Sequence, residues 1–261
     1  MKISLIDLAF LSEKRTNVLL LLEEGPKTGD EIKTALNVSS TSIMPQIKKL
    51  KEGNLILQGE DSKYRLSEMG EIVVEKMGPL LNTVRVFEEN YDYWINHDFS
   101  GIPEHLLNRI DELGNYFLLE PDLNRLFEVP EDFKKNLLES RRVMTFFSFF
   151  HPLYLDLYSE LVKKEAEMFL ILTEPVFERM KKDYNEDLRF LLESKNTKIY
   201  ICDKNITLKN VVTDRFCSVL LFDRKGKFDH QRLISFDESA LKWCEELFMY
   251  YKNMSIPLEN L

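Results

Sequence analysis

The chain has 261 residues, a formal net charge of −9, and a composition that is 44% hydrophobic and 30% charged. This is the composition of a globular protein with one large domain or two ordinary ones, and it excludes low-complexity and collagen-like chains. No apolar run reaches the roughly 18 residues that cross a membrane. Because Asp7, Glu13 and Lys14 interrupt the N-terminus too early for a signal peptide, we expect a cytoplasmic protein without a membrane partner.

The three cysteines, Cys202, Cys217 and Cys244, lie far apart in the sequence. Such a set is typical of buried thiols in a reducing compartment rather than of a disulfide framework or a zinc site, although a redox role stays open. No P-loop, G-x-G-x-x-G, G-x-S-x-G or H-E-x-x-H string is present. We therefore expect that the protein is not an enzyme and holds no cofactor or metal. The alternative is a catalytic site assembled from residues that are distant in sequence.

Helical periodicity and a short hairpin organise the first ninety residues. The elements expected in order are a helical run that ends at Gly25-Pro26, a helix capped by Thr28 with Glu31 at the capping-box spacing, a turn at Asn37, a third helix from Ser39 or Ser40 to Gly53, strands over 55–58 and 63–66, and a helix from Ser67. This order is that of a winged helix-turn-helix.

Pro45 is an unusual residue for the third helix because proline lacks the backbone N–H that a helix interior needs. If the helix is capped at Ser40, Pro45 falls in the second turn and the carbonyl of Thr41 loses its partner. If the helix starts at Ser42, Pro45 falls in the first turn at little cost. Both alternatives are compatible with the sequence, and we expect a local distortion.

The third helix and the hairpin contain the candidate contacts to duplex DNA. In this fold the N-terminal half of the recognition helix enters the major groove, and the wing reaches phosphate or the minor groove. Hydroxyl and amide side chains read base edges, and lysines neutralise phosphates. The candidate DNA-binding residues are Ser39, Ser40, Thr41, Ser42, Gln46, Lys48, Lys49, Lys63 and Arg65. The net charge of −9 disfavours binding to phosphate, so the prediction depends on this local surface.

We divide the chain into a winged helix-turn-helix over 1–68, a connector helix with its junction over 69–100, and an α/β domain over 101–261. The connector is more apolar than one small domain requires. Packing onto its own domain and dimerisation are both open, and a two-fold dimer would match a palindromic operator.

Strands and helices alternate after residue 101. We expect strands over 116–119, 143–150, 168–172, 198–202, 211–213 and 217–222, and helices over 131–139, 153–164, 175–182, 188–192 and 238–251. Strands bounded by helices predict a mixed α/β layer architecture with a largely parallel sheet.

The carboxyl ends of such strands are where open α/β sheets bind ligands. The candidate ligand-binding residues at these ends are His151, Thr173, Glu174 and Asp203, joined by Tyr154 and Tyr158, which lie one turn apart on the helix after His151. Each also has a purely structural interpretation, as a helix cap, a turn former or a buried junction residue.

Two long segments resemble archaeal methanogenesis regulatory proteins. They are FFSFFHPLYLDLYSEL over 146–161 and the stretch from Val211 that ends in a motif with Asp223, Gly226, Asp229, Ala240, Trp243, Leu247, Phe248 and Tyr250-Tyr251. Those proteins join an ArsR-like winged helix to a sensor domain, so the resemblance covers nearly the whole chain. Cys244 stands where the family usually has glycine.

The sensor domain is also similar to phospholipase-D-like folds. The catalytic H-x-K-x-x-x-x-D string is absent, because His230 is followed by Gln231-Arg232. We therefore expect no lipase chemistry.

The resemblance implies transcriptional control in the cytoplasm and fixes no ligand. The sequence thus predicts a DNA-binding regulator. The partners that we expect are duplex DNA, a second copy of the chain, and a small-molecule or protein effector. The alternative is a protein-interaction adaptor whose winged helix no longer binds DNA, which the net acidity permits.

Overall fold

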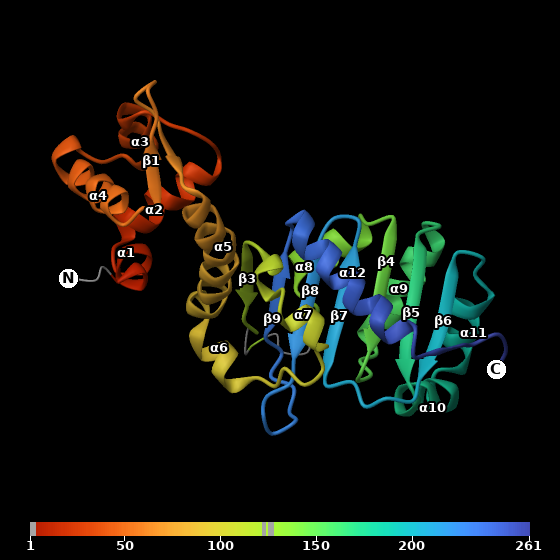
Figure 1. The fold of residues 1–261 in the computed structure, drawn as a ribbon. Coiled ribbons are helices and arrows are strands. Elements are labelled where there is room, and N and C mark those ends of the chain that lie inside the picture. Colours follow the sequence, from red (N-terminus) through yellow and green to blue (C-terminus); the bar gives the residue numbers. More distant parts are fainter. Residues whose placement is uncertain (1–3, 122–123, 125–127) are drawn as a thin grey trace. The chain divides into compact units, whose positions relative to one another are not determined.

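The computed structural model describes residues 4–121, 124 and 128–261 (Figure 1). The chain divides into two compact units, Met1–Asn82 and Thr83–Leu261, and the division falls inside helix α5 (Glu68–Glu89). It therefore lies within the segment expected to be the connector. None of the helices in the described residues is long and apolar enough to span a membrane.

The first unit is a winged helix-turn-helix, as predicted. Its elements are α1 (Leu5–Phe10), α2 (Glu13–Glu23), α3 (Gly29–Leu36), α4 (Ser40–Glu52), β1 (Ile56–Gln58), β2 (Tyr64–Leu66) and the start of α5. β1 and β2 pair antiparallel and form the wing. Val18, Leu19, Ile32, Ile43 and Ile47 are fully buried in one core. The helices pack because their apolar residues recur at helical spacing.

Caps predicted from the sequence set both ends of α3 and the start of α4. The Thr28 hydroxyl accepts a hydrogen bond from the Glu31 N–H at 3.2 Å, and the Thr28 N–H donates to the Glu31 carboxylate at 2.6 Å. Asn37 ends α3 in the left-handed conformation with φ 51°, which asparagine tolerates better than most residues. Ser39 is the N-cap residue of α4. These local signals set where one helix stops and the next begins.

Pro45 lies in the second turn of α4, since the helix begins at Ser40. The cap is Ser39, one residue earlier than in the first of the two alternatives, but the position of Pro45 in the second turn agrees with that alternative. The carbonyl of Thr41 therefore has no i+4 N–H partner. Both Thr41 and Pro45 are exposed, so water can solvate the freed carbonyl.

The second unit is built on an eight-stranded sheet with the order β10-β6-β5-β4-β7-β8-β9-β3. Its strands are β3 (Tyr116–Leu119), β4 (Arg142–Phe147), β5 (Glu167–Thr173), β6 (Thr197–Cys202), β7 (Leu208–Thr213), β8 (Cys217–Leu221), β9 (Arg232–Ser235) and β10 (Ile256–Pro257). The mixed α/β class is confirmed. Parallel pairing, however, is confined to β4-β5 and β5-β6, and the other neighbouring strands pair antiparallel. The sheet is therefore mixed rather than largely parallel.

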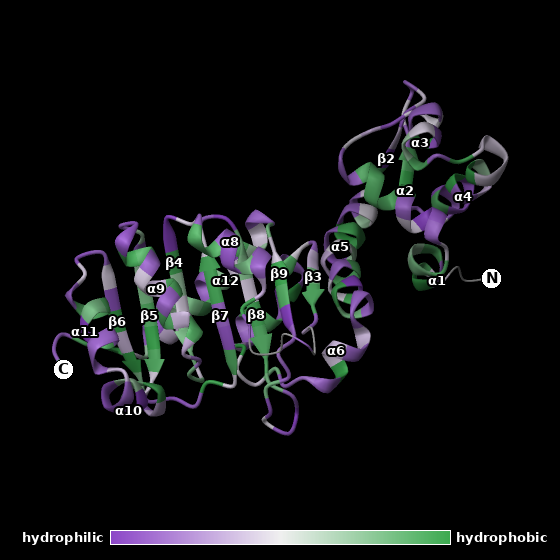
Figure 2. Ribbon diagram, turned by 180° about the vertical axis from the view of Figure 1, so that it is seen from behind, coloured by the Kyte–Doolittle hydropathy of each residue, from purple (hydrophilic) through white to green (hydrophobic). Residues whose placement is uncertain are grey.

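Helices cover both faces of this sheet (Figures 1 and 2). One face carries α8 (Glu131–Leu138), α9 (Leu153–Lys163), α10 (Glu174–Asp183) and α11 (Asn185–Glu193). The other carries α6 (Tyr91–Asn96), α7 (Glu104–Leu107), the 3-10 helix η1 (Ile110–Leu113) and α12 (Glu238–Lys252). Each face has its own apolar cluster, so the central strands are buried on both sides.

Several elements differ from the sequence-based expectation. β4 ends at Phe147, so residues 148–150 are not part of the strand. β7 begins at Leu208, three residues earlier than expected. β9, β10, α6 and α7 were not predicted, because each is short and lacks a clear period.

Gly70 permits a close approach between α5 and the wing. A Cβ atom at this position would lie 2.0 Å from the carbonyl oxygen of Leu55. We expect Gly70→Ala to destabilise the first unit by on the order of 2 kcal/mol, because backbone must move to relieve the clash. Hydrogen exchange of peptides from 4–82 measures this change.

Gly78→Ala is the matched control on the same helix, since a Cβ there meets no atom within 4 Å. It should raise stability by about 0.5–1 kcal/mol through helix propensity. Equal effects of the two substitutions would contradict the packing argument.

Candidate nucleic-acid interface and ligand site

The N-terminal half of α4 presents a row of hydroxyl groups. Ser39, Ser40 and Thr41 are exposed, and Ser42 is partly exposed. The Ser39 and Thr41 hydroxyls lie 3.0 Å apart, and the Ser42 hydroxyl donates to the Ser39 carbonyl at 3.1 Å. Exposed hydroxyls at the start of a helix are positioned for phosphate oxygens and base edges.

Gln46 is less free than the sequence suggested. Its side-chain carbonyl accepts a hydrogen bond from Arg15 Nη1 at 2.9 Å. Arg15 also donates to the carbonyls of Leu8 and Asp7, so it ties α4 to the preceding helices. The Gln46 amide nitrogen is the part of this side chain that remains for a base contact. Arg15 was not among the predicted site residues.

The predicted cations lie on α4 and the wing. Lys48, Lys49 and Arg65 are exposed, and Lys63 is partly exposed. Lys48 is 3.9 Å from the Glu52 carboxylate, and both side chains are solvent-exposed, so this pair restrains Lys48 only weakly. Lys51 instead donates to the Gln58 side chain at 2.7 Å and links α4 to β1.

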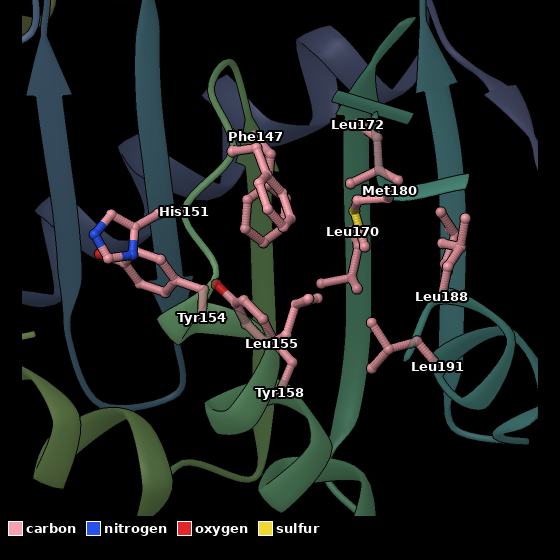
Figure 3. Close-up of a pocket in the computed structure, with 12 residues that line it drawn as sticks. Phe147, His151, Tyr154, Leu155, Tyr158, Leu170, Leu172, Met180, Leu188 and Leu191 are labelled. Atoms are coloured by element: carbon pink, nitrogen blue, oxygen red, sulfur yellow. The ribbon is translucent and has the colours of Figure 1, made fainter. Parts of the chain in front are cut away.

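A small apolar cavity lies between the sheet and α9 to α11 in the second unit. The predicted residues His151, Tyr154 and Tyr158 all line it. Figure 3 shows His151 and Tyr154 at one end and the leucines of β5 and α11 at the other. Its enclosed space is on the scale of a single water molecule, so it cannot hold a sizeable ligand as it stands.

The other predicted ligand residues are not part of this cavity. Thr173 is buried as the N-cap residue of α10, and its hydroxyl donates to the Phe147 carbonyl at 3.3 Å. Glu174 and Asp203 are exposed, and Asp203 is 3.7 Å from the Lys204 ammonium. Thr173 thus has the position of a helix cap, whereas ligand binding by Glu174 and Asp203 stays a prediction.

Lys209 and Arg232 adjoin the cavity, and sequence reasoning missed both. Lys209 on β7 is 1% exposed and Arg232 on β9 is 6% exposed. The Lys209 ammonium lies 3.3 Å from the centroid of the Tyr154 ring, and Arg232 Nη1 is 3.5 Å from the Tyr154 hydroxyl. The available signal was a cation within each apolar strand, in LKNVVT and RLIS.

The two cations change the acid–base properties of the site. Burial alone raises the pKa of Tyr154, but the charges of Lys209 and Arg232 outweigh it and lower the pKa to about 8. Burial lowers the pKa of Lys209 to about 8 as well, with Tyr154 opposing the shift. Burial lowers the pKa of His151, and the neighbouring basic groups Lys209, His230 and Arg232 lower it further, so this imidazole is mainly neutral at pH 7.

These features define a two-part protein in which a winged helix-turn-helix precedes a mixed α/β domain with a buried polar site. Family models described as methanogenesis regulatory protein FilR1, N-terminal domain and middle domain, match residues 5–85 and 126–254. The chain belongs to this family, which confirms the resemblance drawn from its sequence.

Two relatives from archaea show the extent of the similarity. Methanogenesis regulatory protein FilR1 of Methanothrix harundinacea is 24% identical over 254 residues, which are 95% of this chain and 57% of the relative. The HTH-type transcriptional activator ArnR of Sulfolobus acidocaldarius is 27% identical over 129 residues, which are 49% of this chain and 45% of the relative. The chain thus spans about half the length of each relative.

Solved structures show more distant likenesses. The archaeal chromatin protein TrmBL2 superposes with a TM-score of 0.44 and 14% identity, covering 97% of both chains. NucT from Helicobacter pylori superposes with a TM-score of 0.41 and 13% identity, covering 55% of this chain and 99% of that one.

The lowered pKa of Tyr154 is measurable, because a tyrosinate absorbs near 295 nm. We expect one of the ten tyrosines to ionise near pH 8, and Tyr154→Phe to remove that step. Tyr158→Phe is the control and should leave the step in place, since burial raises the pKa of Tyr158 far above it. A step near pH 8 that persists in Tyr154→Phe would refute the assignment.

Proposed function

We propose that this chain is a DNA-binding transcriptional regulator, with the first unit as the DNA-binding part and the second as an effector-binding part. The observation that carries the proposal is the exposed N-terminal half of α4 beside the wing, within a winged helix-turn-helix core. This is the geometry in which a helix enters the major groove. The names of the two archaeal relatives, a regulatory protein and a transcriptional activator, support it.

Local charge supports DNA as the partner despite the net charge of −9. Residues 40–66 contain five lysines and arginines against three carboxylates. Because affinity for duplex comes largely from cations that displace counterions, this surface matters more than the total. Membership of the FilR1 family supports a role in the control of methanogenesis genes.

The proposed regulator acts as a homodimer. α5 presents exposed apolar residues at helical spacing, namely Met69, Ile72, Leu80 and Val84, with exposures of 37%, 64%, 53% and 41%. Such a stripe supports packing against a second copy. A two-fold pair would place two α4 helices on a palindromic site.

Salt dependence of DNA binding tests the proposal. Against mixed-sequence duplex DNA, the affinity should fall steeply as salt rises, and the Lys48→Ala and Lys49→Ala substitutions should each reduce the logarithmic slope by about one. Fluorescence anisotropy across a salt series measures the slope.

Lys181→Ala and Lys182→Ala provide a matched control, because they form an adjacent exposed pair on α10. They should leave the slope unchanged. If the Lys48 and Lys49 variants also leave it unchanged, these lysines do not contact phosphate. If the intact chain does not bind duplex at all, the protein-interaction adaptor, which the net acidity permits, replaces the regulator.

A further inference from the structure

Two buried cations lie on one face of the sheet in the second unit. Lys209 pairs across the sheet with Leu220, and Arg232 on β9 is the next residue before Leu233, which pairs with Val219. Lys209, Leu220 and Arg232 therefore lie in one row across β7, β8 and β9. Val211 and Ile234, two residues further along their strands, pack in the core beneath α8 to α11, so both cations point to that face.

Aromatic rings separate the two cations. Tyr154 lies between them, with Lys209 over its ring and Arg232 at its hydroxyl. The Lys209 ammonium is also 5.3 Å from the centroids of Phe147 and Phe149, and the Arg232 guanidinium is 4.7 Å from that of Phe133. Cation–π contacts stabilise a buried charge in part, but they supply no counter-charge.

No ion pair within the described residues involves either cation. Lys209 Nζ and Arg232 Nε are buried without a hydrogen-bond partner. A buried charge normally has a partner of opposite sign, because desolvation otherwise disfavours the folded state. A site with this arrangement is expected to bind a counter-ion.

Further hydrogen-bonding groups gather around the pair. His151 Nδ1, the Tyr158 hydroxyl and the Ser218 hydroxyl are likewise buried and unpartnered. Ser218 pairs with Val211 and Ile234 in register, so it shares the face of the two cations. A lysine, an arginine, two hydroxyls and a neutral imidazole all donate hydrogen bonds. The ligand that satisfies them is rich in acceptors.

We propose that this cluster, defined by Lys209, Arg232, His151, Tyr158 and Ser218, binds a phosphate dianion, either free or as the head of a phosphomonoester. Two cations match the charge of nearly −2 that a phosphomonoester carries at pH 7. Arginine and lysine are the side chains that proteins use for this group. His151 and His230 are partly exposed and lie within electrostatic range of the cations, so the cluster reaches solvent on the histidine side.

The role of this anion as the effector rests on the proposed regulator, whereas binding itself does not. A cationic ligand would be repelled by Lys209 and Arg232. A neutral apolar ligand would leave the buried donors of the cluster without hydrogen-bond acceptors. An oxyanion supplies both the negative charge that the two cations lack and the acceptors that the buried donors need.

Calorimetric titration of the full chain with inorganic phosphate tests the site. The intact protein should bind phosphate, and Lys209→Met and Arg232→Met should each weaken binding by about a hundredfold or more, as expected for one partner of a buried charge pair. Lys182→Met, an exposed lysine on α10, should bind as the intact chain does. Absence of phosphate binding, or equal binding by all the variants, would overturn the proposal.

Unfolding without phosphate separates a ligand site from a structural one. Lys209→Met removes a buried cation that lacks a counter-charge, so its unfolding temperature should equal or exceed that of the intact chain. A marked fall would mean that the cation is structural. His151→Ala, at a partly exposed position, is the second variant, and it should weaken phosphate binding about tenfold with unchanged unfolding.

Comparison of anions distinguishes the source and the class. A gain in affinity for glycerol phosphate over inorganic phosphate would identify a phosphomonoester, and the reverse would identify free phosphate. Succinate bound more tightly than either would reject the phosphate class. Binding to mixed-sequence duplex is measured in parallel, so a chain that binds DNA but no phosphate rejects only this site, and a chain that binds phosphate but no DNA rejects only the regulator.

Discussion

The burial of strand β7 on both faces constrains the second unit more than any other feature. All six of its residues are buried, yet Lys209 and Asn210 are among them. Every polar group on such a strand needs a partner inside the protein. Asn210 has partners for two of its groups, since its side-chain N–H donates to the Cys244 carbonyl at 2.8 Å and its backbone carbonyl accepts from the Thr145 hydroxyl at 2.8 Å, whereas its Oδ1 has none among the described residues. The Lys209 ammonium contacts three aromatic rings and has no ion-pair partner among the described residues.

Asn210 and Lys209 therefore differ in role: the first is a structural residue, and the second is a candidate ligand-binding residue. Asn210 joins β7 to α12 and β4, so its burial is offset by hydrogen bonds that hold the layers together. Lys209 instead contacts the ring of Tyr154 and faces a second cation, Arg232. The first unit places its cations differently. Its core cluster is apolar, and the cations of α4 and the wing are at the surface. The two units thus place their positive charge differently, at the surface in the first and in the interior in the second.

Local signals explain why the first unit could be predicted closely. The capping box of Thr28 and Glu31, the left-handed Asn37 and the apolar spacing of α4 are properties of neighbouring residues, and they are visible in one sequence. Whether neighbouring strands pair parallel or antiparallel is not a local property. The alternation of strands and helices holds for β4, β5 and β6, but β7, β8 and β9 follow one another without helices between them and pair antiparallel.

The candidate site likewise combines residues that are close in sequence with residues that are distant in sequence. His151, Tyr154 and Tyr158 belong to one strand–helix unit, so their common cavity follows from chain order. Lys209 and Arg232 reach Tyr154 from strands more than fifty residues away in sequence. β9 was not recognised at all, because RLIS is short and follows a segment without period. Pairing between distant strands creates the site, and one sequence does not display it.

α5 is the covalent route by which the two parts of the proposed regulator can influence each other. Val74 and Met77 pack in the core of the first unit, whereas Val86 packs in the core of the second. Gly78 and Pro79 lie between these anchors. Proline removes one helical hydrogen bond and glycine adds backbone freedom, so the helix is weakest between its two halves. In the proposed regulator, a ligand of the second unit would change DNA affinity only by its preference for one arrangement of this helix over another.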